Sequence, residues 1–204
     1  MTPISRDWGF DRGLPIDRLY LERFMEAHRG DIKGRVLEVA NNDYTIRFGG
    51  EQVSRSDILH PCKGNPRATI IADLSVRDPR LDGTFDCIIC TQTLQLIYDF
   101  RSAVTQLHHW LKPGGVALVS VPGISQISRE DMEKTGDYWR FTGAAVRRMF
   151  SEEALEVDVL GNVLAATAFL HGIAADEFDA RELFERDPQF HMLTTVRAVR
   201  IGTS

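Results

Sequence analysis

Two carboxylates early in the chain have the spacing of a nucleoside-binding site. Glu38 stands in the apolar stretch Arg35 to Val39, and Asp57 follows it by 19 positions, near the end of a second apolar stretch. In a βαβ unit, this spacing places an acid beside the ribose hydroxyls of a bound nucleoside. We therefore predict that Asp57 binds a ribose, with the capping of a turn or helix as its alternative.

Polar residues also follow the next two apolar stretches. Asp73 comes after the stretch 68–72, while Thr91 and Gln92 come after 85–90. Ligands of open α/β sheets bind beyond the carboxyl ends of the strands, so we expect these residues to border the same site. For Asp73, an ordinary helix cap ahead of Leu74 is an equally good interpretation.

The turn after the first stretch is poor in glycine. Ala40, Asn41, Asn42 and Asp43 occupy positions where nucleotide-binding loops usually carry glycines. Asn and Asp accept left-handed backbone angles better than most residues, so they are expected to replace glycine in part. The missing glycines affect how closely the backbone can approach a ligand, and hence affinity.

Glu38 itself lies at the end of an apolar strand, where a carboxylate needs a partner or water. We expect it to face the ligand. The alternative is a structural ion pair with Arg35 or Arg47.

Strands and helices alternate along the chain and must position these residues. Apolar or β-branched runs predict strands at 36–39, 53–59, 68–72, 85–90, 116–121, 155–160 and 191–201. Helical periodicity predicts helices at 17–27, 99–111, 142–150 and 162–171. Continuous hydrophobicity in the middle strands indicates burial on both faces, which is typical of a parallel sheet covered by helices on each side. The predicted fold is therefore α/β, a doubly wound Rossmann-like sheet.

The chain is expected to form a single domain over residues 1–204. Residues 1–34 form a helical lead-in, 122–141 a long loop on the acceptor side, and 161–190 a helical insertion before the last strand. Lys112-Pro113-Gly114-Gly115 is predicted to stop a helix and turn the chain into a strand. The apolar helix at 163–170 is expected to be core, with a homodimer contact or a lid as its alternative.

Composition limits the function classes. A formal charge of −5 disfavours a nucleic-acid partner, because phosphate contacts need clustered Lys and Arg. Cys62, Cys87 and Cys90 cannot all pair, and two of them lie in an apolar run, which predicts a reducing compartment. The sequence shows neither a signal-peptide pattern nor an apolar run of membrane-spanning length, so we expect a cytoplasmic protein without membrane association.

The chain resembles the class I S-adenosylmethionine-dependent methyltransferases, particularly small bacterial members associated with glycan or glycosyltransferase gene products. The resemblance rests on segments spread over most of the chain: 15–18, 36–50, 56–60, 68–74, 85–95, 111–115, 137–142 and 186–188. It implies a seven-stranded, mostly parallel sheet with an antiparallel last strand. It also implies S-adenosylmethionine as the cofactor.

The resemblance assigns roles to the residues named above. Glu38 and the backbone of residues 40–43 would face the methionine end of the cofactor, and Asp57 would hold the ribose. Asp73 and the amide of Leu74 would meet the adenine. Thr91 and Gln92 would border the sulfonium. A charge-assisted hydrogen bond from a diol to a carboxylate is about twice as strong as a neutral one, which suits Asp57 to this role.

The acceptor is expected to meet the loop at 122–141. Tyr138, Trp139 and Arg140 suit a sugar, because aromatic rings stack on the C–H faces of sugars and Arg fixes polar groups. The alternative is a surface loop pinned by buried Trp139 and Phe141, with Arg140 extending its charge to solvent.

Three side chains are candidates for a general base toward a hydroxyl acceptor. Asp137 is preferred, with His60 and His171 as alternatives. No metal-binding motif is present in the sequence.

Three function classes follow. The first is a methyltransferase acting on an oxygen of a sugar, a glycan or another small hydroxylated acceptor. The second is a nucleotide-sugar or nicotinamide enzyme, which would favour a glycine-rich first loop. The third is a non-catalytic binding or assembly protein with a degenerate cofactor loop.

Overall fold

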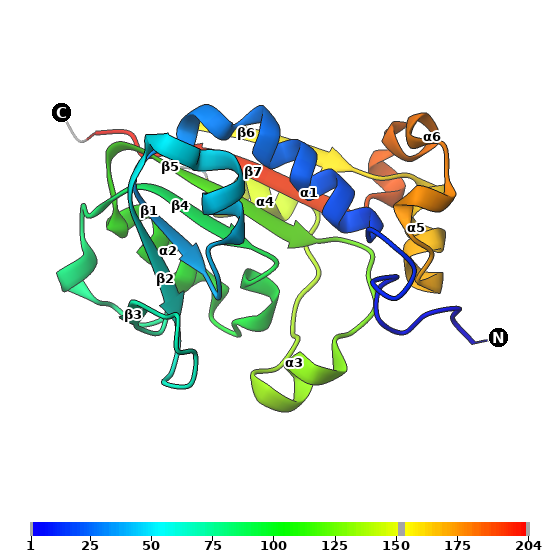
Figure 1. Cartoon of the computed structure of the whole chain (residues 1–204), viewed down its shortest axis with the longest axis horizontal. Helices are drawn as coiled ribbons and strands as arrows, with labels where there is room; N and C mark the ends of the chain where they lie inside the picture. The colour runs from blue at the N-terminus through cyan, green and yellow to red at the C-terminus, as the bar shows by residue number, and fades with distance from the viewer. Residues whose placement is uncertain (1, 151–153, 203–204) are drawn as a thin grey trace.

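A seven-stranded sheet forms the centre of the molecule (Figure 1). The structure is a computed structural model that describes residues 2–150 and 154–202. The strands lie in the order β3-β2-β1-β4-β5-β7-β6. Their bounds are β1 Gly34–Val39, β2 Val53–His60, β3 Ile70–Ile71, β4 Phe85–Thr91, β5 Leu111–Pro122, β6 Ala154–Leu160 and β7 Leu193–Val199. Strands β1 to β5 run parallel, and β7 lies antiparallel between β5 and β6, which confirms the predicted doubly wound sheet.

Helices cover both faces of this sheet. Their bounds are α1 Ile16–Ala27, α2 Phe100–Trp110, α3 Arg129–Lys134, α4 Gly143–Met149, α5 Val163–His171 and α6 Ala180–Phe184. Leu21, Phe24 and Met25 of α1 pack on one face, and residues of α2 and α4 belong to the cluster on the other. Helix α5 packs Ala165 and Phe169 into a third cluster with α1, so one face of this helix is core as predicted, whereas Val163, Leu164 and Leu170 are exposed.

The apolar run of β4 divides between the two faces. Cys87 and Ile89 join the cluster beneath α1, whereas Ile88 and Cys90 join the cluster beneath α2. All four side chains are fully buried. Burial raises the pKa of the Cys90 thiol to about 12, so Cys90 is neutral and packs as an apolar side chain.

Several predicted boundaries are wrong, and the third strand and the turn at 112–115 are the main cases. The third strand has two residues, Ile70–Ile71, rather than five, because only these pair with β2. Helix α2 ends at Trp110, and the segment 112–115 lies within β5 rather than before it. The reason is that buried Leu111 already pairs with Phe85 of β4.

Asp57 does not lie at the end of β2, contrary to the sequence prediction. It pairs across the sheet with Leu37, and β2 continues to His60. Its side chain is 1% exposed and accepts hydrogen bonds from Arg35 Nε at 2.7 Å and Thr69 Oγ1 at 2.9 Å. Arg55 Nε lies 3.0 Å from the same carboxylate. Asp57 thus forms a buried ion pair inside the sheet, and the ribose-binding role is not supported.

The same contacts set the charge state of Asp57. Burial alone would raise the pKa of its carboxyl, but hydrogen bonds from Arg35, Thr69 and Arg55 outweigh burial and lower the pKa. A carboxylate with a lowered native pKa stabilises the fold above its unfolded pKa. That stability is lost as the pH falls through the native pKa.

We therefore expect Asp57→Asn to lower the free energy of unfolding by about 2 kcal/mol at pH 7, because buried hydrogen bonds to charged groups are lost. The difference from wild type should shrink below about pH 4, where the unfolded carboxyl is protonated. Urea unfolding at pH 7 and pH 3 measures both values. As a control, Asp158→Asn in the exposed pair with Arg186 should change stability by less than about 1 kcal/mol. Equal effects of Asp57→Asn at the two pH values would contradict this account.

Candidate functional site

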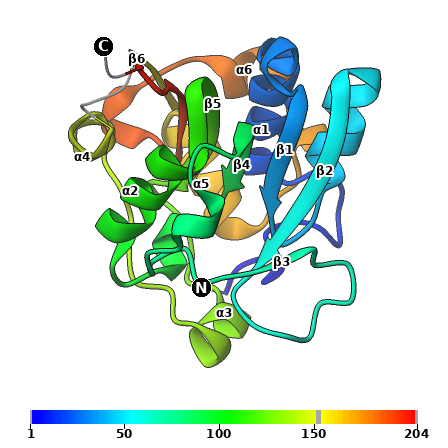
Figure 2. The ribbon, with the colours of Figure 1, turned by 90° about the vertical axis from the view of Figure 1, so that its left-hand side faces the viewer.

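The carboxyl ends of the parallel strands meet at one edge of the sheet. The chain leaves this edge at Ala40 after β1, His60 after β2, Gln92 after β4 and Pro122 after β5. Helix α3 and the loop between β2 and β3 lie at the same end of the sheet (Figure 2). The structure thus brings most of the predicted cofactor residues to one edge, although Asp57 is not among them.

Two residues at this edge have left-handed backbones. Ala40 has φ 72° and Gln92 has φ 46°. The Ala40 N–H donates to the Leu59 carbonyl at 2.9 Å, and the Gln92 N–H donates to the Ser120 carbonyl at 3.0 Å. A left-handed conformation costs about 1–2 kcal/mol for residues with a Cβ, and such strain is typical of functional sites.

The glycine-poor loop meets this constraint at an unexpected position. Asn and Asp were expected to take the left-handed angles, but Ala40 does so, and Asn41, Asn42 and Asp43 do not. The expectation is wrong because the turn is tightest directly at the strand end. Ala40 is therefore the position where a missing glycine matters.

Glu38 shapes this loop from below. Its side chain is buried, with Oε2 accepting from Thr45 N at 2.8 Å and Thr45 Oγ1 at 2.7 Å, and Oε1 accepting from Tyr44 N at 3.2 Å. Burial raises the pKa of Glu38, and the hydrogen bonds from Thr45 and Tyr44 offset part of that rise. Glu38 thus accepts hydrogen bonds from the start of the helical turn at 45–49 and anchors the loop to β1.

The two ion pairs considered for Glu38 are not formed. Arg35 pairs with Asp57, and Arg47 pairs with Glu22. Both alternatives for Glu38 are therefore wrong.

The loop between β2 and β3 is hydrogen-bonded to the loop after β1. Asn65 Nδ2 donates to the Ala40 carbonyl at 2.8 Å, and Arg67 donates to Asn42 Oδ1. Asn42 Nδ2 in turn donates to Ser56 Oγ at 3.0 Å. These contacts fix the strained turn.

The residues after β2 and β3 have local partners. His60 Nδ1 lies 2.7 Å from the Cys62 carbonyl oxygen at the position where Asp57 was expected. Asp73 Oδ1 accepts from Ser75 N at 2.8 Å and Ser75 Oγ at 2.7 Å, so Asp73 closes a turn, and the helix expected by its alternative interpretation does not begin there. The Leu74 side chain is buried in the core beneath α2. Thr91 ends β4 and accepts from Thr93 Oγ1 through its carbonyl.

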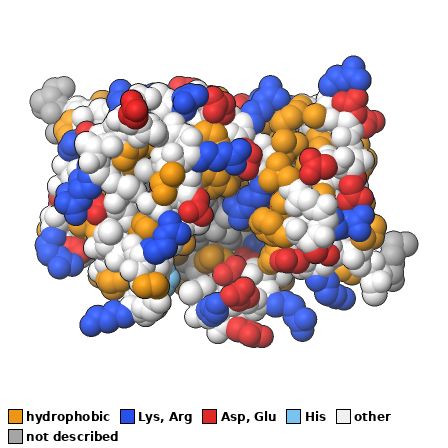
Figure 3. All heavy atoms as spheres, in the orientation of Figure 1, with side chains coloured by type: hydrophobic (Ala, Val, Ile, Leu, Met, Phe, Trp, Pro, Cys, Tyr) orange, Lys and Arg blue, Asp and Glu red, His pale blue; other side chains and the backbone are white. Residues whose placement is uncertain are grey.

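A cleft of about 210 Å³ opens beyond the ends of β4 and β5. A recess is visible in Figure 3 beside the lobe that contains α3. The cleft is lined by the N-terminal segment (Trp8, Phe10), α1 (Asp17, Arg18), the turn after β4 (Gln92, Gln95, Leu96), the 122–141 connection (Pro122, Ser125, Gln126, Ser128, Glu130, Asp131, Asp137, Arg140), and Phe169 and Met192.

The 122–141 connection is a loop whose two ends are hydrogen-bonded to each other. The Phe141 N–H donates to the Pro122 carbonyl at 2.8 Å, which joins its two ends. The Tyr138 N–H donates to the Gln95 carbonyl at 2.9 Å and ties the loop to the turn after β4. The predicted acceptor-side loop therefore forms one wall of the cleft.

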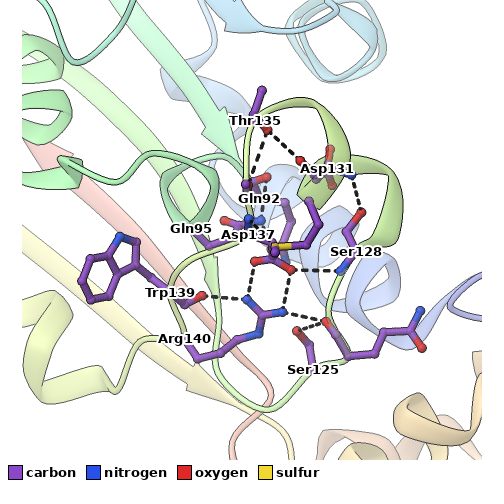
Figure 4. A network of polar contacts seen from close by, with 12 residues as sticks. Gln92, Gln95, Ser125, Ser128, Asp131, Thr135, Asp137, Trp139 and Arg140 are labelled. Atoms are coloured by element: carbon purple, nitrogen blue, oxygen red, sulfur yellow. Dashed lines mark hydrogen bonds and ion pairs between the residues drawn. The ribbon is translucent and has the colours of Figure 1, made fainter.

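Asp137 and Arg140 bind each other within this loop (Figure 4). The guanidinium donates to both carboxylate oxygens at 2.6 and 2.8 Å, and Ser128 N donates to Asp137 Oδ2 at 2.9 Å. Burial alone would raise the pKa of Asp137, but Arg140 and the Ser128 amide lower it overall. A buried carboxylate with these partners and a lowered pKa is a poor proton acceptor, so the geometry does not favour Asp137 as the base.

The other predicted base candidates lie elsewhere. Neither His60 nor His171 lines the cleft. His171 ends α5, and its carbonyl accepts hydrogen bonds from Ile4 N and Ser5 N.

The predicted sugar-binding residues divide. Trp139 Nε1 donates to the Ile97 and Tyr98 carbonyls at 3.2 Å, and its ring packs edge-on to Phe100, so Trp139 anchors the loop to the core. The exposed Tyr138 donates to the Thr135 carbonyl at 3.0 Å and does not line the cleft. Arg140 lines the cleft but is ion-paired rather than extended to solvent.

Among the cleft residues that were not predicted, two have a buried oxygen without a partner in residues 2–150 and 154–202. Asp17 and Gln95 are each 8% exposed, and Asp17 Oδ1 and Gln95 Oε1 have no hydrogen-bond partner within the part of the chain that the structure describes. In the sequence, Asp17 is an ordinary acid in the first turn of a helix. Gln95 carries no local signal, because its position depends on contacts with a distant loop.

Other features can be stated for residues 2–150 and 154–202 alone. Within these ranges no helix has the length and apolar character needed to cross a bilayer. The same residues bring together no group of three His, Cys, Asp or Glu side chains that could hold a metal ion.

We expect Ala40→Gly to raise the free energy of unfolding by about 0.5–1 kcal/mol. Relief of the left-handed strain should exceed the added entropy of the unfolded chain. Urea unfolding measures the change. Ala145→Gly, at an exposed position in α4, is the matched control and should lower stability by about 0.5–1 kcal/mol. A stability loss of the same size at Ala40 would show that its backbone is not strained.

Solved structures with the same fold cover nearly the whole chain. An S-adenosylmethionine-dependent methyltransferase from Mesorhizobium loti is 18% identical, with 91% of this chain and 100% of that chain covered and a TM-score of 0.61. The [4+2]-cyclase SpnF is 14% identical, with 98% and 88% covered and a TM-score of 0.58. Phosphoethanolamine N-methyltransferase 2 from Haemonchus contortus, solved with S-adenosylmethionine, is 14% identical, with 98% and 54% covered and a TM-score of 0.55.

Sequence comparison gives curated relatives and a family. The ubiquinone/menaquinone biosynthesis C-methyltransferase UbiE of Klebsiella pneumoniae is 28% identical over 140 residues, which are 60% of this chain and 53% of the relative. The chain thus spans about half the length of the curated relatives it matches. The model of the methyltransferase domain family matches residues 24–160, from α1 through β6. With this match and the sheet order described above, the chain belongs to the methyltransferase domain family.

Proposed function

We propose that this chain uses S-adenosylmethionine to methylate an oxygen of a small hydroxylated acceptor, with a sugar or glycan as the leading candidate. Membership of the methyltransferase family supports methyl transfer. The observation that carries the acceptor class is the cleft beyond β4 and β5, where two buried oxygens, Asp17 Oδ1 and Gln95 Oε1, lack hydrogen-bond donors. A hydroxylated molecule would supply those donors.

The strand edge offers a set of residues that fit the cofactor. The backbone of 40–42 and the Asn41 side chain would hold its methionine end, and Thr91 and Gln92 would border the sulfur. Asp73 would lie near the adenine. Strained backbone at Ala40 and Gln92, which border this edge, supports the assignment. When bound, the cofactor supplies a methyl group on a positively charged sulfur.

His60 replaces Asp57 in this proposal. The His60 Nδ1 lies 2.7 Å from a carbonyl oxygen, so Nδ1 carries the proton and Nε2 is free to accept. At the end of β2, His60 Nε2 would accept a hydrogen bond from a ribose hydroxyl. Asp57 would keep its structural role.

The cleft, rather than Trp139, supports an acceptor with a carbon framework. Trp8 and Phe10 line it, and aromatic rings pack well on the C–H faces of sugars. Methyl transfer is a displacement in which positioning supplies much of the rate, so walls on several sides of the acceptor favour the reaction.

A specific observation favours a second candidate function. In this candidate the chain is a non-catalytic protein, or catalyses a reaction other than methyl transfer. Asn65 and Arg67 already occupy the Ala40 carbonyl and the Asn42 side chain, which a cofactor would approach. The fold is also found in a [4+2]-cyclase, so fold alone does not fix the reaction.

Calorimetry separates these candidates. We expect wild type to bind S-adenosylmethionine and S-adenosylhomocysteine but not NAD. His60→Ala should weaken S-adenosylmethionine binding about two- to tenfold, through the loss of one hydrogen bond. Asp57→Asn, measured where it is folded, should leave binding unchanged. Failure of wild type to bind either sulfur compound would leave the non-catalytic candidate.

A further inference from the structure

Two residues that line the cleft each have a buried side-chain oxygen without a partner among the described residues. Asp17 Oδ1 and Gln95 Oε1 are buried and have no hydrogen-bond partner within the described chain. Asp137 and Arg140, which also line the cleft, pair with each other. Buried polar atoms without partners are rare in native proteins, because leaving them unpaired is costly. A bound ligand would remove that cost.

Asp17 is compensated for its burial only in part. Arg18 Nε lies 4.0 Å from Asp17 Oδ2, which is beyond hydrogen-bond distance. Burial raises the pKa of Asp17, and the charge of Arg18 and hydrogen bonds from the Arg18 and Asp17 amides offset part of the rise. Tyr44, from the loop after β1, is close enough for its pKa to depend on both Asp17 and Arg18. Asp137 and Arg140 line the same cleft as a paired unit.

The orientation of the Gln95 amide is fixed by its own contacts. Nε2 donates to the Gln92 carbonyl at 2.8 Å, so Oε1 is the amide atom left to accept. The Gln95 carbonyl accepts from Tyr138 N and Trp139 N, which holds the residue in place. The oxygen is thus placed by the turn after β4 and the 122–141 loop together (Figure 4).

The two unpaired atoms select the chemistry of the ligand. An ionised carboxylate and an amide oxygen only accept hydrogen bonds, so the ligand must present two donors. Trp8 and Phe10 line the same cleft and favour a compact carbon framework.

We propose that Asp17 and Gln95 bind two hydroxyl groups of the acceptor, and that Asp17 removes the proton from the hydroxyl that is methylated. The proposal rests on the proposed function and names the acceptor-binding pair and the base of that site. It places the base on α1 instead of in the 122–141 loop.

The step balances as follows in atoms and electrons. Asp17 Oδ1 takes the hydroxyl proton, and the electron pair left on the acceptor oxygen forms the new C–O bond to the methyl carbon. The C–S bond of the donor breaks, and its electron pair stays on sulfur, which becomes neutral. Asp17 then gives its proton to solvent when the methyl ether leaves.

The first test needs no ligand. Asp17→Asn should raise the melting temperature at pH 7 by about 2–4 °C, because it removes a buried, poorly compensated charge. The matched control Asp57→Asn, which removes a fully paired buried carboxylate, should lower it. A lower melting temperature for Asp17→Asn would mean a structural role and would overturn the proposal.

The second test measures methyl transfer from labelled S-adenosylmethionine. The hydroxyl probes are methyl α-D-glucopyranoside, myo-inositol and catechol, and putrescine is the amine probe. With a hydroxyl probe that wild type methylates, Asp17→Asn should lower kcat about 10²- to 10⁴-fold while calorimetric cofactor binding stays unchanged. Gln95→Met, a second variant, should mainly raise KM.

Each remaining outcome has a meaning. Unchanged kcat in Asp17→Asn overturns the base, and transfer to putrescine alone, or to none of the hydroxyl probes, overturns the acceptor class. A wild-type protein that does not bind S-adenosylmethionine removes the proposed function instead. The melting temperatures, measured without ligand, still decide whether the Asp17 carboxylate is structural.

Discussion

The left-handed backbone at the ends of β1 and β4 is the constraint on which the rest of the site depends. Parallel pairing brings Ala40 and Gln92 to the same edge and fixes the preceding residues in register, so each turn must begin immediately. Neither residue favours this geometry, and the surrounding hydrogen bonds hold it in place. Hydrogen bonds that involve Ser56, Glu38, Asn65 and Arg67 hold the loop after β1 in this geometry.

Among the buried acids, the number of hydrogen bonds that each carboxylate accepts distinguishes structural residues from candidate functional ones. Glu38, Asp57 and Asp137 have similar burial, but each has a complete set of donors from the turn after β1, from β1 and β2, or from the acceptor-side loop. Asp17 has no such set. Residue type and strand position alone favoured the first three as functional groups, whereas the pairing of their oxygens assigns them to the scaffold. The carboxylate that local packing leaves unsatisfied is the one available for a ligand.

Features that depend on local sequence patterns were predictable, and features that depend on contacts between distant residues were not. The sheet and most helices were predictable, because periodicity and continuous hydrophobicity report local geometry and two-sided burial. The structural role of Asp57 was not predictable, because its charge is neutralised by Arg35, which lies 22 residues away in sequence. Trp139 was assigned to an exposed function for a similar reason, since its partners Ile97 and Tyr98 lie about 40 residues earlier. The cleft combines segments from both ends of the chain, so no local spacing encodes it.

Composition alone suggests that the missing glycines only limit how closely the backbone can approach a ligand. The structure adds a second effect, which is competition between the ligand and a neighbouring loop. A glycine at Ala40 would make the turn without strain, but the chain instead surrounds an alanine with donors from a neighbouring loop. Those donors compete with any ligand for the Ala40 carbonyl and Asn42. Cofactor affinity then depends on the difference between two sets of hydrogen bonds rather than on backbone access alone, because binding at the loop must replace the contacts of Asn65 and Arg67 or leave them in place. The sequence of the loop after β1 weakens backbone contacts to the cofactor. The cleft on the acceptor side keeps its own unpaired oxygens, so acceptor binding does not depend on the same contacts.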